Sequence, residues 1–120
     1  MKIDYDFDEL IEDIKSELEK IGLIFLREED REDLNYIRIL SFVYDDYIID
    51  TTIYGESDKK FMISYIYSEF VNGHKTASED ETLSYTVVGI PVDNLVRVDK
   101  SIRIFSKMIE LYQKEQKKEE

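Results

Sequence analysis

Hydrophobic residues near the start of the chain recur at helical spacing. Between residues 7 and 21 they fall three and four positions apart, which places them on one face of an α-helix. Asp6 followed by Glu9 is typical of a helix N-terminus, and Gly22 suits the left-handed turn that often ends a helix. The pattern predicts a helix over residues 7–21 with the buried face Phe7, Leu10, Ile11, Ile14, Leu18 and Ile21.

From residue 23 to residue 90 the pattern shifts toward alternation, with a period of two. Isoleucine, valine, tyrosine, phenylalanine and threonine dominate this part of the chain, as they do in half-buried strands. The connections are short, so strands that follow one another in sequence are expected to pair as antiparallel neighbours. Five strands are predicted, at residues 23–28, 35–44, 47–54, 60–70 and 82–90.

The last part of the chain returns to helical spacing after Pro91. Asp93 or Asn94 is predicted to be the N-cap of this helix. The polar residues 113–120 are expected to fray. The main apolar line of this helix is Leu95, Val98, Ile102, Phe105, Ile109 and Tyr112.

These elements predict one α+β domain spanning residues 1–120. Its order is α-β-β-β-β-β-α, a five-stranded antiparallel meander sheet flanked by an N-terminal and a C-terminal helix. This order of elements resembles that of the secretion chaperones and of the YbjN-like sensory regulators. The resemblance implies an alternative function, a dimeric chaperone or adaptor that binds a client peptide.

The adjacent carboxylates Asp45 and Asp46 raise the question of a catalytic metal pair. Pairing Tyr44 with Tyr47 across them gives a coherent hairpin, and aspartate tolerates the positive φ of a tight turn. We therefore interpret the two aspartates as a turn. His74 is the only histidine and the chain has no cysteine, so no metal site, cofactor or catalytic residue is predicted and an enzyme is not expected.

The charge balance narrows the choice of partner. The chain has 28 acidic and 16 basic residues, a net charge of −12, which disfavours direct binding to nucleic acid or membranes. No apolar run approaches the length of a membrane span, and the acidic start is unlike a signal peptide, so a cytoplasmic protein is expected.

Acidic residues gather in two segments, and a protein that displays them can engage a basic partner. In its most specific form this hypothesis describes an inhibitor that mimics nucleic acid. The alternative is that the acidic residues only keep the protein soluble. The clustered carboxylates of the segment Glu28–Asp33 could also chelate calcium, but the segment lacks the glycine and the alternating ligand spacing of an EF-hand loop. The predicted partner-binding residues are Asp8, Glu9, Glu12, Asp13, Glu17 and Glu19 in the first helix, with Glu28, Glu29, Asp30, Glu32 and Asp33 as a second patch.

A second apolar line on the last helix consists of Ile104, Met108 and Leu111. It makes the apolar surface wider than one sheet face covers, which indicates either burial on two sides or a homodimer contact. A third hypothesis, a small-ligand cavity between the sheet and the helices, stays open.

Overall fold

The structure of the protein is a computed structural model. It describes residues 3–30, 36–45, 47–71, 74–76 and 83–118. The elements are α1 (Phe7–Lys20), β1 (Ile24–Asp30), β2 (Ile37–Tyr44), β3 (Tyr47–Glu56), β4 (Lys60–Val71), β5 (His74–Thr76), β6 (Ser84–Pro91) and α2 (Val96–Lys118).

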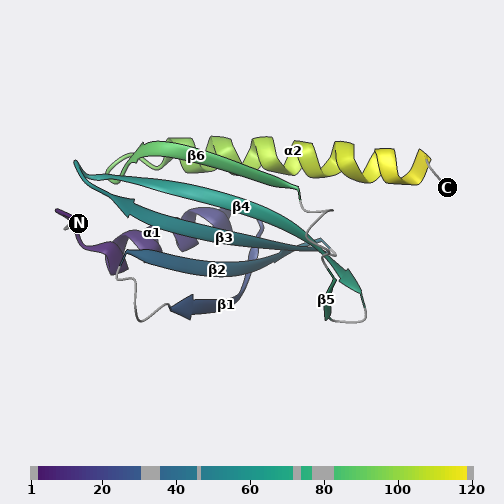
Figure 1. Ribbon diagram of the computed structural model, residues 1–120, viewed down its shortest axis with the longest axis horizontal. Helices are drawn as coiled ribbons and strands as arrows, with labels where there is room; N and C mark the ends of the chain where they lie inside the picture. The colour runs from purple at the N-terminus through teal and green to yellow at the C-terminus, as the bar shows by residue number, and fades with distance from the viewer. Residues whose placement is uncertain (1–2, 31–35, 46, 72–73, 77–82, 119–120) are drawn as a thin grey trace.

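The strands form one antiparallel sheet with both helices on the same side of it (Figure 1). The five long strands pair in the order β1-β2-β3-β4-β6, so the predicted α+β meander between two helices is confirmed. The structure adds the short strand β5, which pairs with the end of β4 within the segment expected to be a loop. Its three residues are too few to show an alternating pattern, and they include His74, which was expected in a loop.

The hydrophobic core lies between the sheet and the two helices. Alternate residues of each strand point toward the helices, as the two-residue period of a strand requires. The predicted apolar face of the first helix and the main apolar line of the last helix both reach this core, apart from Ile21, Leu95 and Tyr112, which pack at its edge. The sheet contributes Leu40, Phe42, Tyr47, Ile49, Ile53, Phe61, Ile63, Tyr65, Tyr67 and Ile90.

The β2–β3 hairpin has the predicted register. Tyr44 pairs with Tyr47, and further along the hairpin Ser41 pairs with Asp50. Asp45 has a φ of 54°, the left-handed conformation that a tight turn requires, while Asp46 lies outside the described residues. On the face away from the helices, the buried hydroxyl of Ser41 donates a hydrogen bond to Oδ1 of Asp50 at 2.7 Å.

Both helices begin at side-chain caps. Oδ1 of Asp6 accepts a hydrogen bond from the backbone N–H of Glu9, and Oδ1 of Asn94 accepts one from Val96. Gly22 ends α1 with a φ of 107°, as predicted. The second helix continues to Lys118, so it includes residues that the sequence assigned to a frayed tail.

One tyrosine hydroxyl connects the sheet to α2 inside the core. The hydroxyl of Tyr65 lies 2.6 Å from Oγ of Ser101, and its ring stacks on Phe105 with the centroids 5.6 Å apart. Burial disfavours the phenolate and raises the pKa of Tyr65 above its ordinary value of 10.0. The protonated hydroxyl is therefore part of the folded state.

This pKa shift predicts a loss of stability in alkali. Because the folded state holds the Tyr65 proton more tightly than the unfolded state, the contribution is fully present below the unfolded pKa of 10.0 and declines as the pH rises above it. We expect Tyr65 alone to add about 1.4 kcal/mol of destabilisation per pH unit above that value. Urea unfolding between pH 9 and 11 measures the slope, and a Tyr65→Phe variant with the same slope would contradict the assignment.

Candidate functional site

The acidic residues predicted on the first helix lie outside its buried face, and Asp8 at the border of that face reaches strand β2. Glu17 is half-buried and forms an ion pair at 3.2 Å with Lys20, which lies three residues further along the helix. The other acidic residues are exposed: Asp8, Glu9, Glu12, Asp13 and Glu19. The buried face of α1 holds the helix against the core and thereby fixes the direction of these carboxylates.

The density of carboxylates on α1 is close to that of phosphates on a DNA strand. The helix has 14 residues, so at a rise of about 1.5 Å per residue it is about 21 Å long. Six predicted partner-binding acids on it give one carboxylate per about 3.5 Å of length, against about 3.4 Å per phosphate on one strand of B-DNA. Lys15 and Lys20 offset part of this charge.

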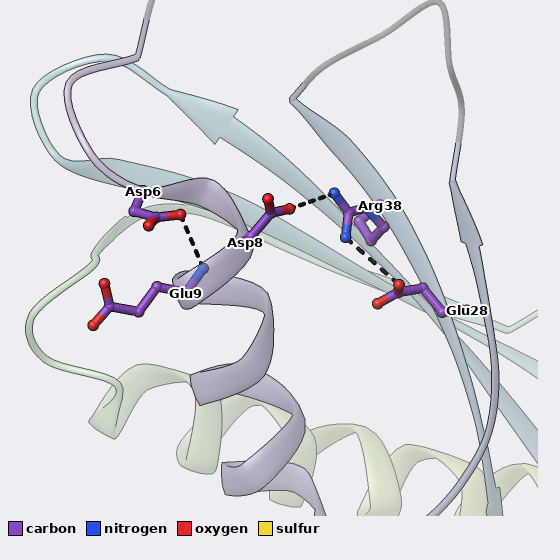
Figure 2. Close-up of polar contacts among 5 residues, drawn as sticks. All are labelled: Asp6, Asp8, Glu9, Glu28 and Arg38. Carbon is purple, nitrogen blue, oxygen red and sulfur yellow. Dashed lines mark hydrogen bonds and ion pairs between the residues drawn. The ribbon is translucent and has the colours of Figure 1, made fainter.

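The second predicted patch is described only in part. Glu28 and Glu29 are exposed on β1, and Asp30 ends that strand. Glu32 and Asp33 lie outside the described residues. The structure brings this patch beside the first one, because the N-terminal end of α1 and the C-terminal end of β1 meet at β2 (Figure 2).

Arg38 on β2 connects the two patches (Figure 2). Its Nη2 donates a hydrogen bond to Oδ1 of Asp8 at 2.8 Å, and its Nη1 lies 3.6 Å from Oε2 of Glu28. The Arg38 side chain is 13% exposed and lies over the ring of Phe7. It therefore holds the two carboxylates at fixed positions while both reach solvent. We call Asp8, Glu9, Glu12, Asp13, Glu17, Glu19 and Glu28 the acidic face. Glu29 pairs with Ile39 and therefore lies on the opposite side of the sheet from Glu28, which pairs with the core residue Leu40.

Sequence reasoning did not identify the role of Arg38. A signal was present, because Arg38 is the only basic residue in the predicted strand 35–44. Its two partners are 30 and 10 positions away in sequence, so the contact depends on how α1 and β1 pack against β2.

The basic residues of α2 do not neutralise the acidic face. In the part of the chain that the structure describes, Arg103 pairs with Asp99 of its own helix, and no ion pair joins α1 to α2. Asp8 pairs with Arg38 and Glu17 with Lys20, whereas Glu9, Glu12, Asp13 and Glu19 are exposed to solvent.

A pocket of about 200 Å³ lies at one border of the acidic face. The hydroxyl of Tyr5 fixes one wall, since it donates to the carbonyl of Lys60 and accepts from the N–H of Glu56. Burial raises the pKa of Tyr5, which favours the protonated hydroxyl that this contact needs. Carboxylates and apolar groups line the pocket together: Tyr5, Asp6, Glu9, Leu10, Asp13 and Val92.

The three predicted dimer-contact residues differ in their exposure to solvent. Met108 is half-buried and packs against the core, whereas Ile104 is 48% exposed and Leu111 is 62% exposed. Beside them a shallow groove of about 490 Å³ separates the end of α1 from the middle of α2. It is lined by Ile21, Tyr44, Arg103, Ile104, Ser106, Lys107 and Glu110.

The described residues contain no group of three or more histidine, aspartate or glutamate side chains placed to hold a metal ion. None of the helices in the described ranges is both long and apolar enough to cross a bilayer. No protein-family model, curated protein or solved structure matches this chain. The acidic face and the exposed side of α2 are the two candidate functional surfaces.

Proposed function

We propose that the protein is a non-enzymatic interaction module whose acidic face binds a basic protein partner. The observation that carries this proposal is the group of exposed carboxylates on α1, which Arg38 joins through Asp8 to Glu28 of β1. A patch of one sign of charge on a rigid element attracts a partner of the opposite sign and orients it before contact.

The pocket beside the acidic face suits a lysine or arginine side chain of the partner. The apolar stem of such a side chain can pack on Leu10 and Val92, while its charged end reaches Glu9 or Asp13. Binding would then proceed by electrostatic capture followed by insertion of this anchor. In the sharpest form of the proposal the partner is a nucleic-acid-binding protein, and the acidic face occupies its basic groove.

Salt and DNA provide the test. We expect the immobilised protein to capture a basic partner from the host lysate at about 50 mM salt and to release it at about 500 mM, because screening shortens the reach of charge. If the partner binds nucleic acid through the same groove, duplex DNA should compete with the acidic face. Capture that is indifferent to salt would contradict the electrostatic proposal, and failure of DNA to compete would contradict the mimicry alone.

A second candidate function is a dimeric adaptor that holds a client peptide. The exposed side chains of Ile104 and Leu111 favour it, because apolar groups that stay outside the core are available for contact with another chain.

A further inference from the structure

Four exposed residues form a line along the outer side of α2. Lys100, Ile104, Leu111 and Glu115 are separated by four, seven and four positions, which keeps them on one side of an α-helix. The line spans about 22 Å at a rise of about 1.5 Å per residue. We call these four residues the outer stripe. Lys100 lies at its N-terminal end, Ile104 and Leu111 lie in the middle, and Glu115 lies at its C-terminal end. The exposed Lys107 lies beside the outer stripe, between the two apolar residues.

This order makes the outer stripe complementary to itself when one copy is reversed. In an antiparallel pair of α2 helices, Ile104 of each copy faces Leu111 of the other. The same register places Lys100 of each copy opposite Glu115 of the other, so two ion pairs flank the two contacts between Ile104 and Leu111. Lys107 of each copy lies near the two-fold axis, where its long side chain can reach solvent. We propose that the protein forms a homodimer through this contact, with a two-fold axis between the paired helices.

The position of α2 leaves room for a second copy. The helix lies along one side of the molecule, and its C-terminal end extends past the sheet (Figure 1). The antiparallel arrangement also places opposite ends of the helix dipoles side by side. A single helix pair is a small interface and each copy carries a net charge of −12, so the dimer dissociates at micromolar concentrations.

Charge exchange between Lys100 and Glu115 tests the register. Sedimentation velocity of the full chain over about 5–500 µM, a range that brackets a weak small interface, should show a concentration-dependent dimer. We expect Lys100→Glu and Glu115→Lys each to weaken dimerisation about 10-fold, because each places like charges opposite one another twice. The double variant should return to within about 3-fold of the wild type, since it restores both pairs with reversed signs.

The two single variants also separate pairing from net charge. Lys100→Glu changes the net charge from −12 to −14, whereas Glu115→Lys changes it from −12 to −10. If only overall repulsion mattered, the second variant would strengthen the dimer. Glu110→Lys is the matched control, because it makes the same charge change on the same helix outside the outer stripe and should not weaken association. Far-UV circular dichroism confirms that each variant is folded.

The two contacts between Ile104 and Leu111 provide an independent test. Ile104→Ser combined with Leu111→Ser should leave a monomer up to the highest concentration. Both positions are exposed, so we expect this variant to stay folded. A wild-type chain that stays monomeric throughout, or a charge exchange that does not restore association, overturns the proposal. The outer stripe contains no residue of the acidic face, so these outcomes do not depend on binding to a basic partner.

Discussion

Replacing Phe105 with alanine is expected to lower the free energy of unfolding by about 3–5 kcal/mol. The Phe105 side chain is fully buried between α2 and the sheet and stacks on Tyr65. Its removal takes away apolar contact area and leaves a cavity that the surrounding strands cannot close. The free energy of unfolding of a small domain is only about 5–15 kcal/mol, so this one substitution removes a large part of it. Urea unfolding followed by far-UV circular dichroism measures the loss.

Val96→Ala is the control for this prediction, because Val96 is an exposed residue of the same helix. It should change the free energy of unfolding by less than about 0.5 kcal/mol. An effect of Phe105→Ala as small as that of the control would contradict the docking of α2 against the sheet.

Reversing two charges on the acidic face should slow association with the basic partner about 10-fold. Glu12 and Glu19 lie seven positions apart on the outer side of α1, and both are exposed. Replacing both with lysine puts repulsion where the partner first makes contact. The rate should also depend less on salt, because fewer opposite charges attract over distance. Stopped-flow or surface plasmon resonance measurements with the captured partner give both quantities.

The matched control reverses two acids away from the acidic face, at Asp45 and Glu110. Both are exposed, and the variant has the same net charge as the first one. Lysine at position 45 fits its left-handed backbone, since Lys59 has a φ of 55° in this structure. Equal slowing by the two variants would show that total charge, and not the acidic face, governs association.

The elements that could be predicted from the sequence are those whose signals are local. The helical spacing of residues 7–21 predicted α1 to within one residue, because its core contacts, its cap and its terminating glycine all lie in one short segment. The β2–β3 register followed from alternation around a two-residue turn. The strand β5 was missed because three residues carry no period, and its pairing depends on the end of β4.

The candidate site was predictable only as separate residues. Exposure of the α1 carboxylates follows from the position of the opposite apolar face. The sequence could not show that Arg38 would join Asp8 to Glu28, because that contact requires α1 to cross the sheet beside β1. Likewise, the apolar line of α2 was visible in sequence, but only packing showed that Met108 reaches the core while Ile104 and Leu111 do not.

The placement of β1 has a consequence for how the protein avoids aggregation. It is the last strand at its side of the sheet, and Ile24 on it is 67% exposed. An open apolar edge of this kind can template the addition of strands from other chains. Glu28 and Glu29 lie on the same strand, beyond the register shift between Phe25 and Arg27. Repulsion between carboxylates and a locally irregular backbone both oppose the pairing of one such edge with another, so we expect Glu28 and Glu29 to limit edge-to-edge aggregation independently of the proposed partner.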